Sequence, residues 1–272
     1  MNSEAHVAAV MLDWAGTTVD HGSIAPVLAL QTLFASHDIQ LSSEDARREM
    51  GLLKRDHIQA ILQLENVCVA WARKFGCEPT AEDLDKLYAE FGPLQMEIIT
   101  KHSQVIDGVA ETVARWKSRR IRVGTSTGYT RAMLDPVMIQ ARMQGYSPDS
   151  SVCPDEVGAG RPAPWMLLRN AQLLDVYPLS RCVKIGDTVS DIEEGRNAGM
   201  WTIGLSRTGN MIGLDAATFV ALPETQQQHL VVEAEKALRR SGANYVAEDI
   251  ASCDAILLEI EGLLRRNITP SS

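Results

Sequence analysis

Short apolar runs, each followed by polar or turn-forming residues, predict the strands of a parallel sheet. Residues 7–12 form such a run, which ends at Asp13 and is followed by Gly16. A fully buried strand that leads into a loop has this pattern. Later apolar runs predict further strands at residues 121–125, 151–153, 182–185 and 201–205.

Between the first two of these runs, apolar residues recur at helical spacing. Residues 24–34 show this spacing, and Ser43 is a typical first residue of a helix. This helical stretch interrupts the strand pattern, so we expect residues 23–102 to form an inserted helical cap domain. Further helices within it are predicted at residues 54–64, 66–75 and 81–99.

Helices also follow the later strands. Strands that alternate with helices are typical of an α/β fold with a parallel sheet. The sequence therefore predicts a Rossmann-like core domain, formed by residues 1–22 and 103–272, whose ligands bind at the carboxyl ends of the strands. Its helices are predicted at residues 130–143, from 164 onward, and at 190–198, 222–241 and 249–266.

Composition and charge limit the kind of partner. The chain has 272 residues and a net charge of −9, with its Lys and Arg residues scattered. Nucleic acids and anionic membranes both require a basic surface, so neither is expected as a partner. No apolar stretch approaches the roughly 20 residues of a membrane span, and residues 1–6 lack the basic start and apolar run of a signal peptide, so neither is expected. We expect a cytoplasmic protein that binds a small polar molecule.

The cysteines indicate neither a disulfide framework nor a zinc site. Their number is odd, and they lack the CxxC spacing of metal ligands. We interpret them as reduced thiols, most of them small buried apolar residues. They are Cys68, Cys77, Cys153, Cys182 and Cys253.

Two polar segments at predicted strand ends are candidates for phosphate chemistry. Asp13 begins the segment DWAGTT, whose backbone N–H groups can hold an oxyanion, although an isolated Asp there can simply cap a turn. Thr127 and Gly128 lie in the segment STG, where a phosphate could approach the backbone. An ordinary polar loop has the same composition.

Two later segments add charge. In GRP, the Arg161 guanidinium could neutralise a phosphate with paired donors, although arginine is also common on plain surfaces. In GDTVSD, Asp187 follows a strand and Asp191 lies one helical turn later, a pairing suited to a hard divalent cation. Acidic residues at a helix start can also serve stability alone.

In this order, the four segments resemble the four motifs of the haloacid dehalogenase superfamily, which implies a core of that type with an inserted cap. The resemblance implies that Asp13 is the nucleophile that forms an aspartyl-phosphate. It also implies that Thr127 and Gly128 bind the phosphoryl group and that Arg161 takes a place usually held by a lysine.

The same resemblance implies a magnesium cofactor. Asp13, the carbonyl of Ala15 and Asp187 would hold Mg²⁺, and Asp191 would orient the metal shell. Phosphatases of the superfamily normally have a second Asp two positions after the nucleophile, which protonates a leaving alkoxide. Ala15 stands at that position here, so either no phosphate ester is cleaved or the leaving group needs no proton from there.

Lys54, in the cap segment MGLLKRDHI, is the candidate for a second nucleophile. By helical spacing it shares a face with Ile58 and Ile61. Burial on this apolar face would lower the pKa of the ammonium and make the amine nucleophilic toward a carbonyl. His57 is its neighbour one turn on. Alternatively, Lys54 extends to solvent and His57 is a satisfied interface histidine.

Ala15 and Lys54 together resemble the members of the superfamily that hydrolyse a carbon–phosphorus bond. The signature segments of that branch are similar to DWAGTTVD, MGLLKRDHI, STGYT, AGRPAPWM and GDTVSDIEEGRNAGMW. The resemblance implies a small-molecule phosphonate substrate, phosphonoacetaldehyde, formed in the degradation of 2-aminoethylphosphonate. Acetaldehyde and phosphate would form through a Lys54 imine and the aspartyl-phosphate, with His57 assisting proton transfer and Met50 and Tyr129 lining the site.

Other functions remain open at this point. The same fold could serve a phosphate-ester phosphatase or phosphomutase in which Lys54 only binds substrate, but Ala15 argues against it. A non-catalytic phosphate-binding protein is a third possibility, disfavoured by the full set of reactive side chains. The family resemblance also implies a homodimer, with contacts near Trp71 and residues 24–34, where core packing explains the apolar stripes equally well.

Overall fold

A computed structural model describes residues 6–270. Within this range the strands form one six-stranded sheet in the order β3-β2-β1-β4-β5-β6, and every pair is parallel. β1 lies at the centre, where the strand order reverses, so the residues that follow it reach the position at which such sheets bind ligands. The strands are Ala9–Leu12 (β1), Arg122–Ser126 (β2), Ser150–Val152 (β3), Cys182–Gly186 (β4), Trp201–Leu205 (β5) and Tyr245–Ala247 (β6).

Helices cover both faces of this sheet. Alternate side chains of β1 point to opposite faces. Val10 and Leu12 belong to one apolar cluster, which includes residues of α6, α7 and α12, and Ala9 and Met11 belong to a second, which includes residues of α8. The core helices are Val109–Ser118 (α6), Arg131–Met143 (α7), Trp165–Leu174 (α8), Val189–Asn197 (α9), Ala216–Ala221 (α10), Glu224–Arg240 (α11) and Cys253–Leu264 (α12).

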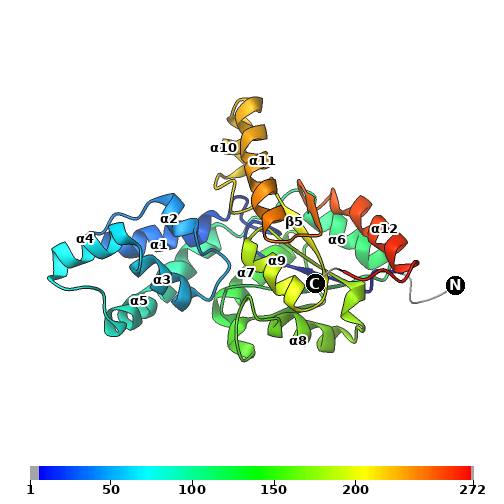
Figure 1. Cartoon of the computed structure of the whole chain (residues 1–272), viewed down its shortest axis with the longest axis horizontal. Coiled ribbons are helices and arrows are strands. Elements are labelled where there is room, and N and C mark those ends of the chain that lie inside the picture. The colour runs from blue at the N-terminus through cyan, green and yellow to red at the C-terminus, as the bar shows by residue number, and fades with distance from the viewer. Residues whose placement is uncertain (1–5, 271–272) are drawn as a thin grey trace.

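Five further helices, which we call the cap helices, lie together beside the core at one end of the molecule's long axis (Figure 1). α1 and α3 both pack against the long helix α5. The domain limits at residues 22/23 and 102/103 stay a prediction, and the cap helices lie within them. These helices are Ile24–Ser36 (α1), Ser43–Arg47 (α2), Lys54–Leu62 (α3), Glu65–Phe75 (α4) and Ala81–Lys101 (α5).

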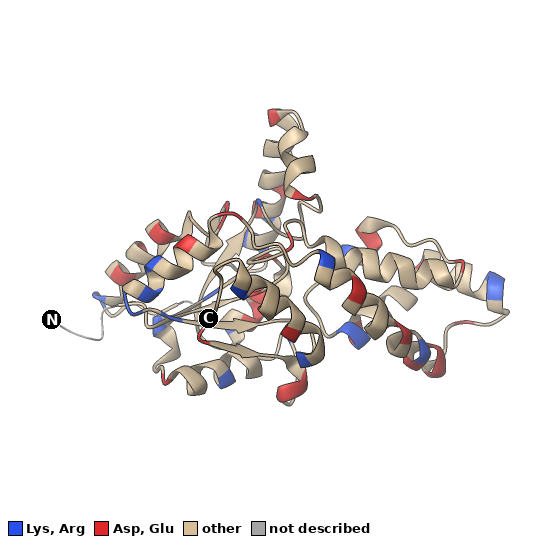
Figure 2. Cartoon of the chain, turned by 180° about the vertical axis from the view of Figure 1, so that it is seen from behind, with Lys and Arg blue, Asp and Glu red and all other residues tan. Residues whose placement is uncertain are grey.

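The elements agree with the sequence-based expectations except in a few places. β5 spans the predicted residues, whereas β1 begins two residues later than the apolar run. α6, α10 and β6 have no counterpart in those expectations. Figure 2 shows Lys and Arg residues interspersed with Asp and Glu along the same helices. None of the helices in residues 6–270 is long and apolar enough to cross a membrane.

Candidate active site

The loops after three neighbouring strands bring the predicted site residues together. Asp13 follows β1, Thr127 follows β2 and Asp187 follows β4, and the carboxyl ends of these parallel strands meet at one edge of the sheet. The backbone N–H of Asp13 donates to the Ile185 carbonyl at 3.1 Å, which ties the first loop to β4. The local sequence therefore fixes the position of the expected nucleophile.

Three buried carboxylates form the centre of the site. Asp13, Asp187 and Asp191 each offer an oxygen, and these oxygens lie within 4.8 Å of one another. The Thr17 hydroxyl donates to Oδ1 of Asp187 at 2.9 Å, and the Asn210 backbone N–H donates to Oδ2 at 2.6 Å. These bonds hold Asp187 in one orientation. Hard oxygen donors gathered in this way suit a divalent cation such as Mg²⁺.

Charge repulsion within this group also favours a cation. Burial raises the pKa of Asp13, and the Arg161 guanidinium only partly opposes this effect. Burial raises the pKa of Asp187 as well, and repulsion from Asp13 and Asp191 raises it further. A bound cation would offset this repulsion and keep both carboxylates ionised.

Arg161 links the nucleophile to a buried network of charges. Its Nη2 lies 2.7 Å from Oδ1 of Asp13, its Nη1 lies 3.0 Å from Asp191, and its Nε lies 3.0 Å from Glu194. Burial alone would lower the pKa of Arg161, but these three carboxylates raise it. The guanidinium is therefore a fixed positive charge beside Asp13, positioned for a phosphoryl group.

Lys184 completes this network, and the sequence analysis did not include it. It lies in β4 with no exposed surface, and its Nζ is 2.8 Å from Asp191 and 2.9 Å from the Ser126 hydroxyl. Although burial raises the pKa of Asp191, Arg161 and Lys184 lower it to about 2. The signal in the sequence was a lysine inside the apolar strand Cys182–Gly186, where an unpaired charge would be costly.

Lys54 is buried at the start of α3 rather than extended to solvent. Only 4% of the residue is exposed, and its Nζ lies 3.9 Å from Sδ of Met50 and 5.7 Å from the ring centroid of Tyr129. Burial lowers the pKa of Lys54 to about 8, although the charge of Asp13 partly opposes this shift. At pH 7, about one Lys54 in ten is therefore the nucleophilic amine, far more than for an ordinary lysine.

A small cavity brings most of the predicted residues together. Its volume is about 20 Å³, which is room for about one water molecule. His57, Asp187 and Asp191 do not line it, although the two aspartates lie beside Asp13. The predicted residues that line it are Asp13, Ala15, Met50, Lys54, Thr127, Gly128, Tyr129 and Arg161.

His57 lies within the cap helices and is completely buried. Burial and the neighbouring Lys54 charge lower the pKa of His57 to about 3, with the Ala46 backbone partly opposing them. The imidazole is therefore neutral at physiological pH. Its predicted part in proton transfer stays a prediction.

The loop before α3 closes the cavity from the cap side. A Cβ atom on Gly51 would lie 2.5 Å from the Ser190 hydroxyl, and one on Gly128 would lie 3.0 Å from the Leu52 carbonyl. Gly51 also has φ of +97°, which L side chains rarely adopt. Glycine at both positions therefore allows the cap loop to contact the core.

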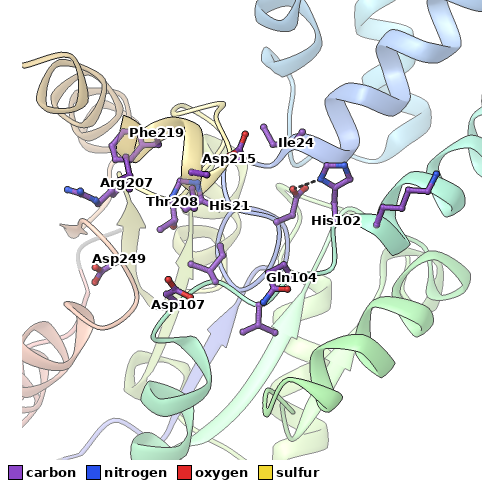
Figure 3. Close-up of a pocket in the computed structure, with 17 residues that line it drawn as sticks. His21, Ile24, His102, Gln104, Asp107, Arg207, Thr208, Asp215, Phe219 and Asp249 are labelled. Atoms are coloured by element: carbon purple, nitrogen blue, oxygen red, sulfur yellow. Dashed lines mark ion pairs between the residues drawn. The ribbon is translucent and has the colours of Figure 1, made fainter. Parts of the chain in front are cut away.

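A second cavity of about 450 Å³ lies where the two connections between the core and the cap helices run together (Figure 3). Asp20, in the connection that leads from the core to α1, contacts the connection that leads back from α5. Its backbone N–H donates to the Gln104 carbonyl, and its carboxylate lies 3.7 Å from His102. The same carboxylate accepts from the Ala25 backbone at 2.9 Å. Burial raises the pKa of Asp20 to about 7.

Comparison with known proteins gives the class to which this site belongs. Residues 7–199 match the family model described as haloacid dehalogenase-like hydrolase. The chain therefore belongs to this family of hydrolases. The predicted α/β fold of haloacid dehalogenase type and the prediction that the chain is an enzyme are both confirmed.

Within this class, the chain is similar along nearly its whole length to phosphonoacetaldehyde hydrolases. It is 43% identical to the one from Syntrophobacter fumaroxidans, over 97% of this chain and 95% of the relative. It is 42% identical to the one from Nitratidesulfovibrio vulgaris, over 97% and 94%. The chain belongs to the phosphonoacetaldehyde hydrolases.

Solved structures agree with this placement. A phosphonoacetaldehyde hydrolase like protein from Oleispira antarctica has a TM-score of 0.96 and 39% identity, covering 97% of this chain and 96% of that one. A β-phosphoglucomutase from Clostridium difficile has a TM-score of 0.65 at 16% identity, covering 94% and 97%, and shows the shared fold alone.

Proposed function

We propose that this enzyme hydrolyses phosphonoacetaldehyde to acetaldehyde and phosphate, in the degradation of 2-aminoethylphosphonate. The observation that carries the proposal is the placement of Lys54 and Asp13 in one small cavity, with Ala15 where a phosphatase would carry its acid. An amine with a pKa of about 8 suits attack on an aldehyde, and a carboxylate beside a guanidinium suits attack on phosphorus. The family relatives support the same substrate.

In the first step, the Lys54 amine attacks the aldehyde carbon, and loss of water gives an iminium ion. The positive charge of this ion is next to the carbon that bears phosphorus, so it can accept an electron pair. Tyr129 and Met50, which lie close to Nζ, hold the amine inside the cavity. The small volume of the cavity and the burial of Asp13 and Lys54 limit the access of bulk water while the iminium ion exists.

In the second step, an Asp13 oxygen attacks phosphorus and the carbon–phosphorus bond breaks. Its electron pair moves into the iminium group, so an enamine leaves and no alkoxide forms. A phosphatase has a carboxylic acid at the position of Ala15 to protonate the leaving alkoxide. No alkoxide leaves in this reaction, which accounts for the absence of that acid. Arg161 neutralises the phosphonate, and Thr127 and Gly128 bind it through the loop after β2.

The residues present fit a magnesium ion, and we propose Mg²⁺ as the cofactor. Asp13, Asp187 and the Ala15 carbonyl would hold it, while Asp191 orients the positive side chains around it. When bound, it would supply the positive charge that lets the Asp13 carboxylate approach an anionic phosphonate. Burial, together with repulsion from Asp13 and Asp191, raises the pKa of Asp187, and a cation would offset both effects, which supports this assignment.

In the last steps the enamine carbon takes up a proton, which regenerates the iminium ion. Water then hydrolyses the iminium ion, releasing acetaldehyde and the Lys54 amine, and a second water hydrolyses the aspartyl-phosphate. One of these waters replaces the one lost when the iminium ion formed, so the reaction consumes one water in total. His57, one turn from Lys54 on α3, is proposed to assist the proton transfers.

Reductive trapping tests the imine route. Borohydride added with phosphonoacetaldehyde should fix an adduct on Lys54, detectable by peptide mass spectrometry, and should stop phosphate release. Lys54→Arg keeps the charge but should form no adduct and release neither product. Lys86→Arg, at an exposed lysine of α5, is the matched control and should behave as wild type. Turnover by Lys54→Arg near the wild-type rate would exclude the imine route and favour direct phosphoryl chemistry.

We also propose that the enzyme is a cytoplasmic homodimer. Its five cysteines are free, as a reducing compartment would keep them. Apolar Leu28 of α1 and Val69 and Phe75 of α4 are exposed on the cap helices, where a partner subunit could cover them. Light scattering should give twice the chain mass for wild type, and Val69→Glu should shift the distribution toward the monomer. A wild-type monomer would refute the dimer.

A further inference from the structure

Arg47 connects the cap helices to the core by hydrogen bonds that the reaction described above does not use. It is the last residue of α2, and its Nη1 lies within hydrogen-bond distance of the carbonyls of Gly22 at 2.8 Å, Ser23 at 3.2 Å and Asn210 at 3.2 Å. Nη1 also reaches the side-chain oxygen of Asn210 at 3.0 Å, and Nη2 reaches the Gly213 carbonyl at 3.3 Å. One cap side chain therefore bonds two separate segments, the connection at Gly22 and Ser23 and the core loop that contains Asn210 and Gly213.

The charge of Arg47 has no close carboxylate to pair with. Within residues 6–270, no carboxylate lies within ion-pair distance of it, and its neighbours are carbonyl and amide oxygens. Burial lowers the pKa of Arg47, while the more distant charges of Asp20 and Asp187 oppose the shift. A planar guanidinium with several donors can satisfy oxygens on different segments at once, which a lysine ammonium cannot do in the same geometry.

Asn210 is the core partner of Arg47 and also holds the carboxylate of the metal site. Its side-chain N–H donates back to the Arg47 carbonyl at 3.2 Å, so the two residues are bonded in both directions. Its backbone N–H donates to Oδ2 of Asp187 at 2.6 Å. Any displacement of Asn210 therefore acts directly on Asp187.

Cap movement must break part of this contact. The substrate cavity has a volume of only about 20 Å³, which is too small for phosphonoacetaldehyde, so the cap has to separate from the core before the aldehyde can bind. Gly22 and Ser23 belong to the connection that precedes α1, and their bonds to Arg47 can persist in an open form. Asn210 and Gly213 belong to the core, so their bonds to Arg47 depend on closure.

We propose that Arg47 and Asn210 form a latch that couples cap closure to the position of Asp187. Arg47 is thus a positioning residue, which acts on the reaction through Asn210 and touches neither substrate nor the reacting atoms. The latch rests on the proposed function only in so far as Asp187 serves the reaction. When the cap closes, Arg47 bonds Asn210, and the Asn210 N–H then holds Asp187 toward Asp13.

The variants that test the latch remove one side of it at a time. Arg47→Met removes the donors but keeps the length of the side chain, and Arg47→Lys keeps one donor group. Asn210→Ala removes the side-chain bonds to Arg47 but keeps the backbone N–H that bonds Asp187. Arg48→Met is the matched control, because the exposed Arg48 follows Arg47 and makes only a 3.6 Å contact with Asp45.

Hydrogen exchange on the metal-free protein gives the first readout and requires no activity. Arg47→Met and Asn210→Ala should each raise exchange at least tenfold in residues 20–24 and 208–214, and Arg47→Lys should give an intermediate value. Exchange in β1 and β4 should stay at wild-type values, which shows that the core has folded. Arg48→Met should match wild type throughout. Unchanged exchange in Arg47→Met would overturn the latch.

Kinetics with phosphonoacetaldehyde give the second readout. Arg47→Met and Asn210→Ala should each lower kcat about tenfold or more and raise the Mg²⁺ concentration for half-activity, with a smaller change in KM for the aldehyde. Because both act in one contact, the double variant should be no more than about twofold below the worse single variant. Effects that multiply, or a lower melting temperature with unchanged kcat, would refute the coupling. If wild type proves inactive on this substrate, the proposed function fails, and hydrogen exchange still decides the latch.

Discussion

The ionisation of Lys54 controls how activity should depend on pH. Burial lowers the pKa of this ammonium from its ordinary value of 10.5 to about 8. That difference corresponds to about 3 kcal/mol of destabilisation of the charged form. The perturbation to apply is pH itself, because only the neutral amine attacks the aldehyde.

The expected magnitude follows from the fraction of amine. With a pKa of about 8, about one Lys54 in ten is neutral at pH 7, compared with about one in three thousand for an ordinary lysine. Between pH 6 and pH 8 the amine fraction rises about fiftyfold, and above pH 8 only about twofold remains to be gained. The value of kcat/KM should therefore rise steeply to about pH 8 and then level off.

Two assays separate Lys54 from other titrating groups. Phosphate release at low phosphonoacetaldehyde concentration gives kcat/KM, in which the substrate also titrates. Inactivation by acetaldehyde with cyanoborohydride, followed by the Lys54 adduct in mass spectrometry, involves no phosphonate. Both profiles should level off at about the same pH. An adduct yield that still rises tenfold per pH unit above pH 9 would show an unperturbed lysine and refute the argument from burial.

Further predictions concern Asp20 in the connection between core and cap helices, Gly51 in the loop before α3, and the proposed divalent cation. The pKa of Asp20 is about 7 in the folded protein and near 3.8 in the unfolded chain. Between these two pH values the folded protein holds a proton that the unfolded chain has lost. The free energy of unfolding should therefore fall by up to about 4 kcal/mol as the pH rises from 4 to 7. The free energy of unfolding, measured with urea at pH 5 and pH 8, should not show this fall in Asp20→Asn. The charged groups that face Asp20, His102 and Arg47, are present in both proteins and so contribute to both measurements. An equal fall in the variant would contradict the assignment. Gly51→Ala should lower kcat/KM more than tenfold, because its Cβ would meet Ser190, and should also lower the melting temperature, because the φ of +97° strains an L residue; unchanged kinetics would show that the cap closes differently. Removal of cations with EDTA should abolish phosphate release yet leave the borohydride adduct of Lys54, and loss of both would show that the amine depends on the cation.

Much of the fold followed from local pattern. β1, at the centre of the sheet, is fully buried and is a continuous apolar run, and β4 and β5 are fully buried strands interrupted only by Lys184 and Thr202 among their apolar residues and glycines. β6 is three residues long, only partly buried and at the sheet edge, so it leaves too short a pattern to detect. α6 does show the helical spacing of Val109, Val113 and Trp116. This short pattern lies directly before the strand predicted at residues 121–125, and the sequence analysis did not separate it from the loop that precedes the strand.

The site was predictable where residues follow strand ends and not where they depend on packing. Asp13, Thr127 and Asp187 lie in motifs whose place on the sheet is set by the strand before them. Lys184 and Asn210 act only through contacts made across the fold, with Asp191 and with Asp187. Sequence spacing carries no record of such contacts, although a lysine within a buried strand signals that partners must exist.

The balance of charge in the site explains why a buried lysine is useful to this reaction. Four carboxylates, those of Asp13, Asp187, Asp191 and Glu194, meet the two fixed positive charges of Arg161 and Lys184. A divalent cation of the kind proposed would offset the remaining two negative charges, which leaves a neutral site before substrate binds. An anionic phosphonate then adds negative charge among buried side chains, where little water can solvate it. Conversion of the Lys54 amine to an iminium ion supplies positive charge at that moment, beside the bond that breaks. A permanently charged Lys54 would instead stay unreactive toward the aldehyde. The lowered pKa of Lys54 therefore lets it react as an amine and gain its positive charge only when the iminium ion forms.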